Sequence, residues 1–402
     1  RRVEADMLTA GQDIDILGAD EGVNLADAVR SITGDINAAT TLGNLVVDGT
    51  VTANDGAVAL EGGGASGVDI NAAVLADDNI DITASVLTVD ATVDSAAGSI
   101  EGMVDGPMTV NADMTAAADV RAAAGDIDID ADVTGTGGHV ELGSGSDFDI
   151  LNDSVITSGQ SLTMAAEESA GIFAMATDSS AAAGTDLVIR GFDTTVDMLT
   201  AGQDIDVFAG TAGLTANDTI TSVTGDIGLQ SAGAITLDGA VDAEDKDVTL
   251  LTTAGDIDVN EAVTAAGDID ITIESSGDLN VANTVTSTAG SIEAVVADLM
   301  TVDSAVTAAA DIRGAADDID LNADVTATGG DLELGSAMDI DLAAGVDVTS
   351  GQDLILAAGE DAGDHVVMDA DSTATAGTDM VLRGRRVEAD MLTAGQDIDI
   401  LG

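Results

Sequence analysis

Residues 330–351 read GDLELGSAMDIDLAAGVDVTSG and contain three short runs in which apolar and polar residues alternate. The runs are DLEL, DIDL and VDVTS, and Gly, Ala and Ser separate them. Alternation with a period of two predicts half-buried strands, because successive side chains of a strand point to opposite sides. Three such strands, turned by small residues, predict one coil of a three-faced parallel β-helix.

Similar segments fill the rest of the chain. The run Asp-Ile-Asp-Ile alone occurs at residues 13–16, 126–129, 268–271 and 397–400. Dividing the sequence before each such run gives about nine segments per half, each of roughly 20 residues, which is a length typical of solenoid coils. We therefore predict an all-β, right-handed parallel β-helix (β-solenoid) with an aliphatic inside and an acidic outside.

The coils belong to a larger repeat. Residues 1–18, RRVEADMLTAGQDIDILG, return unchanged as residues 385–402, so the period is 384 residues. Within it, AAADVRAAAGDIDIDADVTGTGG from Ala116 matches AAADIRGAADDIDLNADVTATGG from Ala308. We expect one continuous solenoid over residues 1–402, with half-units at 12–202 and 203–395, about 18 coils per repeat, and residues 385–402 beginning the next tandem copy.

Composition supports this class against three alternatives. The chain has no Trp, Tyr or Cys, one Pro and four Phe, but 47 Gly. High charge with few aromatics is also typical of disorder, yet 45% of the residues are hydrophobic and the Val, Ile and Leu are regularly placed. An antiparallel sandwich or barrel would show more regular Asn-Gly or Asp-Gly hairpin turns. A helical array is disfavoured because Thr, Val, Asp and Gly are poor helix formers.

The repeated sequence pattern exemplified by GDIDIDADVTGTG at residues 125–137 resembles that of bacterial exoproteins of the filamentous-haemagglutinin type and of related giant repetitive surface proteins. The resemblance covers the whole chain. It implies a parallel β-helical shaft and a place outside the cell or on its surface. It implies no particular enzymatic activity, because the repeated pattern contains no catalytic motif.

Ten Lys and Arg stand against 75 Asp and Glu, which gives a formal net charge of −65. The coil register predicts an outward ladder of carboxylates at the second position of five consecutive coils, namely Asp186, Asp204, Asp226, Asp247 and Asp268. Neighbours at a strand spacing of about 4.8 Å would repel by about 0.9 kcal/mol in water. Two interpretations stay open: a solvated acidic face, and a ladder that binds Ca²⁺, which prefers clustered carboxylate oxygens.

The few basic residues recur between the halves. Arg121 matches Arg313, and Arg190 matches Arg383, which is followed by Arg385 and Arg386. One interpretation is local pairing with neighbouring Asp. The other is that a band formed by Arg190, Arg383, Arg385 and Arg386 docks onto an acidic face of a neighbouring copy of the chain.

We expect no enzyme and no nucleic-acid partner. Phosphate contacts need a basic surface, and a polysaccharide-acting β-helix would need long loops that wall a cleft. His139 and His365 do not recur at equivalent coil positions and are expected to be structural. Phe148, Phe173, Phe192 and Phe208 are expected to fill the core or form a small stack.

The sequence thus predicts a structural shaft of an extracellular bacterial fibre, appendage, sheath or matrix filament. The alternative is the stalk of a giant adhesin of the two-partner-secretion type. The expected partner is the chain itself, end to end and through lateral bundling, with cell-surface or matrix ligands at ends outside this segment. No run of 18 apolar residues indicates a membrane span.

Overall fold

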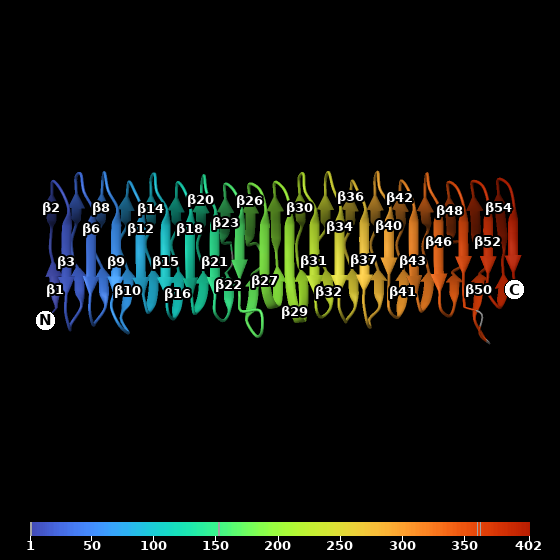
Figure 1. Ribbon diagram of the computed structural model, residues 1–402, viewed down its shortest axis with the longest axis horizontal. Coiled ribbons are helices and arrows are strands. Elements are labelled where there is room, and N and C mark those ends of the chain that lie inside the picture. The colour runs from blue at the N-terminus through green and yellow to red at the C-terminus, as the bar shows by residue number, and fades with distance from the viewer. Residues whose placement is uncertain (1, 152, 360, 362) are drawn as a thin grey trace. The chain divides into compact units, whose positions relative to one another are not determined.

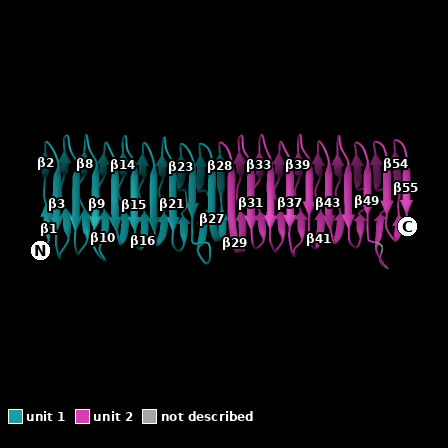
Figure 2. Cartoon of the chain, in the orientation of Figure 1, with its two compact units in different colours: residues 1–201 teal, residues 202–402 magenta. Residues whose placement is uncertain are grey.

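The chain folds as a parallel β-solenoid. The computed structural model describes residues 2–151, 153–359, 361 and 363–402, and every regular element within them is a strand. The chain divides into two units, Arg1–Ala201 and Gly202–Gly402 (Figure 2). In each unit three strands form a coil, and successive coils pair through parallel strands (Figure 1). The predicted fold class is confirmed, and the sandwich and helical alternatives are excluded.

Each coil contributes one strand to each of three faces, which we number in chain order. In the first unit, face 1 holds β3 (Ile14–Gly18), β6 (Ile36–Thr40), β9 (Val58–Gly62), β12 (Ile80–Ala84), β15 (Ile100–Val104), β18 (Val120–Ala124), β21 (Val140–Ser144) and β24 (Leu162–Ala165). Face 2 holds β1 (Val3–Ala5), β4 (Val23–Leu25), β7 (Leu45–Val47), β10 (Gly67–Ile70), β13 (Val86–Val89), β16 (Pro107–Val110), β19 (Asp126–Ile129), β22 (Phe148–Ile150) and β25 (Ile172–Met175), and β27 (Leu187–Val196) continues from face 1 into face 2. Face 3 holds β2 (Leu8–Ala10), β5 (Val29–Ser31), β8 (Val51–Ala53), β11 (Val74–Ala76), β14 (Val93–Ser95), β17 (Met114–Ala116), β20 (Val133–Gly135), β23 (Val155–Ser158), β26 (Ser180–Ala183) and β28 (Met198–Ala201).

The second unit repeats this arrangement. It opens with β29 (Ile205–Ala216), which runs through faces 1 and 2. Face 1 continues with β31 (Ile227–Ser231), β34 (Val248–Thr252), β37 (Ile269–Ile273), β40 (Ile292–Val295), β43 (Ile312–Ala316), β46 (Leu332–Ser336), β49 (Leu354–Ala357), β52 (Met380–Arg383) and β55 (Ile398–Leu401). Face 2 continues with β32 (Ile235–Leu237), β35 (Ile257–Val259), β38 (Leu279–Val281), β41 (Leu299–Val302), β44 (Asp318–Leu321), β47 (Ile340–Leu342), β50 (His365–Met368) and β53 (Arg386–Glu388). Face 3 holds β30 (Ile220–Ser222), β33 (Val241–Ala243), β36 (Val263–Ala265), β39 (Val285–Ser287), β42 (Val306–Ala308), β45 (Val325–Ala327), β48 (Asp347–Ser350), β51 (Thr373–Ala376) and β54 (Met391–Ala394).

The coil at 330–351 shows how the sequence pattern becomes structure. Its three runs form β46, β47 and β48, one on each face. In β47 the Ile and Leu are buried and the Asp between them is half-buried. Alternation therefore places the aliphatic side chains in the lumen and the carboxylates outside, as the sequence predicts.

The lumen is filled by stacked columns of aliphatic side chains, because equivalent residues of successive coils pair in register. Ile227, Val248 and Ile269 follow one another in one such column and are fully buried. Phe148 and Phe173 stack in the same way on face 2 of the first unit, with ring centroids 5.2 Å apart and both side chains fully buried. The predicted core-filling Phe stack is confirmed for this pair.

Small and large core residues compensate each other within the coil at 100–116. Gly102 occupies the face 1 position where neighbouring coils carry larger side chains, and Ala122 follows it in the next coil. Met108 on face 2 and Met114 on face 3 are both buried in the same coil. The long, flexible Met side chain suits such a gap, so face 2 and face 3 supply the volume that face 1 lacks.

The coil that lies 192 residues later has lost part of this compensation. Ala294 and Gly314 are again small, and Met300 is retained, but Val306 stands where the first unit has Met. A cavity of about 40 Å³ lies there, lined by aliphatic residues that include Met300, Val306 and Gly314. The second unit is therefore packed less completely at this coil.

Candidate functional site

The predicted carboxylate ladder lies at the corner where each coil enters face 1. In the second unit the Asp226 N–H donates to Oδ1 of Asp204 at 2.9 Å, and the Asp247 N–H donates to Oδ1 of Asp226 at 3.1 Å. The Asp268 N–H donates to Oδ1 of Asp247 at 2.7 Å, and Oδ1 of Asp268 accepts from the Ser291 N–H at 2.7 Å. The structure thus brings four of the five predicted residues into one column.

The column continues beyond the predicted residues. Further N–H groups donate in turn to Ser291, Asp311, Asp331, Asp353 and Asp379, the last of these from Asp397. Hydrogen bonds to ionised acceptors are stronger than neutral ones. Each carboxylate therefore neighbours another of like charge but also holds the backbone of the next coil, and these bonds oppose the repulsion expected from the sequence.

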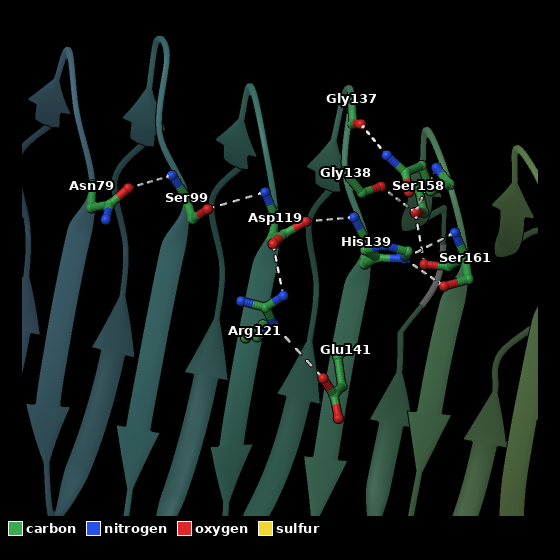
Figure 3. Close-up of polar contacts among 11 residues, drawn as sticks. Asn79, Ser99, Asp119, Arg121, Gly137, Gly138, His139, Glu141, Ser158 and Ser161 are labelled. Carbon is green, nitrogen blue, oxygen red and sulfur yellow. Dashed lines mark hydrogen bonds and ion pairs between the residues drawn. The ribbon is translucent and has the colours of Figure 1, made fainter.

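The first unit has a chemically mixed version of the ladder (Figure 3). The Ser99 N–H donates to Oδ1 of Asn79 at 2.9 Å, and the Asp119 N–H donates to the Ser99 hydroxyl at 3.3 Å. The His139 N–H donates to Oδ1 of Asp119 at 2.8 Å, and Nδ1 of His139 lies 2.6 Å from the Ser161 hydroxyl. Asn79, Ser99 and His139 accept a hydrogen bond from the next coil without a carboxylate, so a ladder bond needs an acceptor and not a negative charge.

A glycine precedes many ladder residues, and the structure shows why. A Cβ on Gly225 would collide with Oδ1 of Asp204, and one on Gly267 would collide with Oδ1 of Asp247. The carboxylate of one coil thus occupies the space where a side chain of the next coil would begin. The recurring Gly-Asp at coil openings is one coupled feature of the ladder and not only a turn signal.

Buried serines also bind the backbone at this corner, on the side that faces the lumen. The sequence analysis did not predict them. The Ser222 hydroxyl donates to the Gln203 carbonyl at 2.6 Å and accepts from the Gly225 N–H at 3.1 Å. Ser287 makes the equivalent bonds to Gly267 and Gly290. The signal was a Ser three residues before the Gly that precedes the ladder residue, at the end of the face 3 strand.

Asp186, the remaining predicted ladder residue, belongs to the first unit. Its carbonyl accepts from the Leu162 N–H at 2.9 Å, which is the backbone pattern of the other ladder residues. Its Oδ1 is buried and has no hydrogen-bonding partner within the described part of the chain. Asp186 is therefore at the expected coil position, but without the side-chain bond that characterises the ladder.

Face 2 carries a second concentration of carboxylates in each unit. Asp320 pairs in register with Asp341, and Asp318 and Asp339 lie beside them. Partial burial raises the pKa of Asp320, and the neighbouring carboxylates, Asp341 first, raise it further. In the first unit burial and then Asp128 raise the pKa of Asp126 in the same way. These groups hold their protons more tightly than isolated carboxyls.

His365 covers this cluster in the second unit. Its Nδ1 lies 3.0 Å from Oδ1 of Asp339, and its Nε2 lies 3.1 Å from Oδ1 of Asp341. The Gly363 carbonyl, which accepts a hydrogen bond from Nδ1, raises the pKa of His365, and the two carboxylates raise it further against the lowering effect of burial. When protonated, His365 is a local counter-charge to these carboxylates, and this geometry agrees with the expectation that it is structural.

The recurrent Arg121 and Arg313 pair locally. Arg121 Nη2 lies 2.7 Å from Oδ2 of Asp119, and its Nε lies 3.8 Å from Oε2 of Glu141 (Figure 3). Arg313 Nη2 lies 2.8 Å from Oδ2 of Asp311. Each arginine thus binds the ladder carboxylate two residues before it, which supports the local-pairing interpretation for these two residues.

The four arginines predicted as an inter-fibre contact lie on the outside of their units. Arg190 is 3.6 Å from Oε1 of Glu168, with 42% of its side chain exposed. Arg383 and Arg385 are exposed, and Arg386 pairs with Glu388 two residues away. Docking by these residues stays a prediction.

At the corner where each coil enters face 1, side-chain oxygens of one coil accept hydrogen bonds from the backbone of the next coil. Among the described residues, no three or more His, Cys, Asp and Glu side chains converge in a way that could hold a metal ion. None of the described segments forms a helix with the length and apolar character needed to cross a membrane. No protein-family model, curated protein or solved structure matches the chain.

Proposed function

We propose that this chain is part of the structural shaft of an extracellular bacterial fibre, appendage, sheath or matrix filament. The observation that carries the proposal is the uniformity of each unit. Each coil is joined to the next by the same parallel strand pairs, and in the second unit the corner ladder also continues from coil to coil. A stack in which every coil templates its neighbour is suited to elongation and support.

Repetition at the level of whole units supports the same proposal. Ile14 pairs with Ile36 of the next coil, and the segment 1–18 that contains Ile14 has the same sequence as residues 385–402. In the second unit Ile398 of that repeated segment pairs with Met380 of the preceding coil. The same sequence therefore pairs with a following coil in the first unit and with a preceding coil in the second unit. We propose on this basis that tandem 384-residue copies follow one another.

We further propose an extracellular location and a non-enzymatic role. The resemblance to surface exoproteins supports the location. The engagement of ladder carboxylates as backbone acceptors supports the role, because these groups already have a structural task. Binding of Ca²⁺ to the free edges of the ladder stays part of the proposal, as an additional means of reducing repulsion.

Immunogold labelling of the producing cells tests the function. Antibodies against the purified chain should label extracellular filaments or a cell-surface layer along their length. Label confined to the cell interior would contradict the proposal. Bundled filaments would favour the fibre, whereas single filaments that end in a globular tip would favour the stalk of an adhesin.

A further inference from the structure

From β36 onward, face 3 of the second unit presents an unbroken line of threonines. In β36, β39 and β42 the middle residue points away from the buried residues on either side of it, and the later strands of face 3 continue this position in register. We call these residues the threonine rank, and they are Thr264, Thr286, Thr307, Thr326, Thr349, Thr375 and Thr393. Seven coils in succession therefore show the same side chain at the same place.

The rank is regular because each threonine pairs directly with the next. Thr264 lies opposite Thr286, Thr286 opposite Thr307, and the pairing continues in the same register to Thr393. Neighbouring strands are about 4.8 Å apart. The rank is thus a straight, rigid array of one hydroxyl and one methyl group per strand spacing.

The hydroxyls of the rank are available to an external partner. Within the described residues none of the seven makes a hydrogen bond to the protein, whereas Thr328, outside the rank, donates to the Ala308 carbonyl at 2.8 Å. A β-branched side chain has few rotamers, so the free hydroxyls are also held in place. A partner would meet a preorganised surface.

The surroundings of the rank lack charge over three consecutive coils. Ala262 and Ala266 lie just beyond the two ends of β36, and Asp242 of the preceding coil pairs with Thr264 and bounds the patch on that side. The next coil presents residues 284, 286 and 288, all Thr, and the next presents Ala, Thr and Ala at 305, 307 and 309. An uncharged patch of this kind is unusual in a chain with 75 acidic residues.

Folding alone does not require this array. The same column in the first unit contains Arg30, Leu75, Asp94 and Ala182 among its threonines, and that unit forms the same coils. Outward positions tolerate these different side chains because they do not pack in the lumen. The second unit also carries Asp242 in this column, opposite Thr264, so the uniform rank distinguishes the coils from β36 onward and calls for an external explanation.

We propose that the threonine rank binds ice. A ligand that fits the rank must be uncharged, must offer hydrogen bonds, and must repeat along one direction at nearly the strand spacing. The lattice of hexagonal ice has a repeat close to that spacing, and its surface both donates and accepts hydrogen bonds. Hydroxyls can join this lattice while the methyl groups and neighbouring alanines exclude mobile water, because apolar surface favours leaving liquid water.

An ice-recrystallisation assay on the purified 402-residue chain tests the proposal. The chain should keep ice grains small, and a fluorescently labelled sample should enter a growing ice crystal. Thr307→Lys places a charge in the middle of the uncharged patch and should abolish both effects. The matched control is Thr301→Lys on face 2, which makes the same chemical change at another outward, half-buried position in β41.

The outcomes separate the alternatives. No effect of the wild-type chain on ice grains overturns the proposal, as does equal loss, or equal retention, of the effect in both variants. If the rank instead joins two copies of the chain, sedimentation will show dimers that Thr307→Lys dissociates, without any effect on ice, and the proposal fails. Circular dichroism of both variants verifies folding, and none of these results bears on the proposed shaft function.

Discussion

Replacing Val306 with Met should fill the cavity beside Gly314 and stabilise the second unit. The first unit carries Met114 at the equivalent place and packs it in the lumen, with 1% of its surface exposed. The substitution therefore transfers a packing solution from one half of the chain to the other. Gly314→Ala would be a poorer choice, because the added Cβ would lie 2.7 Å from Cδ2 of Leu334.

The magnitude follows from the cavity volume. Residual cavities in protein cores cost about 24 cal/mol per Å³, so about 40 Å³ corresponds to about 1 kcal/mol. Since a single Met does not fill the whole space, this value is the upper limit of the gain. The reverse change, Met114→Val, should open a comparable cavity in the first unit and destabilise that unit by a similar amount.

Native-state hydrogen exchange measures the two units separately, which matters because repeat arrays do not unfold as one cooperative unit. In Val306→Met the amides of β43 and β46 should exchange more slowly, and those of β18 and β21 should not change. In Met114→Val the amides of the first unit should exchange faster. Faster exchange in β43 and β46 of Val306→Met would refute the packing argument, because it would mean that the lumen there is already full.

Three further predictions concern the acidic surface. Asp247→Asn keeps an oxygen acceptor for the Asp268 N–H and removes one charge, so its urea midpoint should equal or exceed that of the wild type. Asp247→Ala removes the acceptor and should lower the free energy of unfolding by about 1 kcal/mol. Equal losses of stability in both variants would show that the hydrogen-bond acceptor is not what matters. The melting temperature should rise as the pH falls from 8 towards 6.5, because the raised pKa of His365 contributes stability that is fully present below its unfolded pKa and is lost as the pH rises through the folded pKa. The raised pKa of Asp320 has the same sign, but its contribution is fully present only below the usual carboxyl pKa of 3.8. His365→Gln should reduce this rise near neutral pH, and an unchanged pH profile would contradict the role of His365 as counter-charge. Calcium should raise the melting temperature and a chelator should lower it, and a melting temperature that neither changes would remove Ca²⁺ from the proposal.

The fold could be predicted from the sequence because its determinants are local and repeated. Alternation in DLEL, DIDL and VDVTS identifies strands, and their sequence separation identifies a coil. The position of Asp204, Asp226, Asp247 and Asp268 in one column followed from the same register. Wherever equivalent residues recur at coil spacing, counting along the chain was sufficient.

The interactions within that register could not be predicted by counting. The contact between Gly225 and the Asp204 carboxylate depends on how closely two backbones approach at the corner, which periodicity does not reveal. Likewise, the proximity of His365 to two carboxylates of the preceding coil depends on the path of the turn before β50. The sequence indicated that like charges stack, but the backbone N–H groups that oppose their repulsion are present in every sequence and give no signal of their own.

The most direct test of the shaft proposal is the length gained per tandem copy. Proteins with one, two and three 384-residue copies can be compared by negative-stain electron microscopy. If each copy adds about 18 coils at about 4.8 Å per coil, the particle should lengthen by roughly 86 Å per copy at constant width. A smaller or variable step, or copies that fold back on one another, would contradict the proposal that the repeats continue one solenoid.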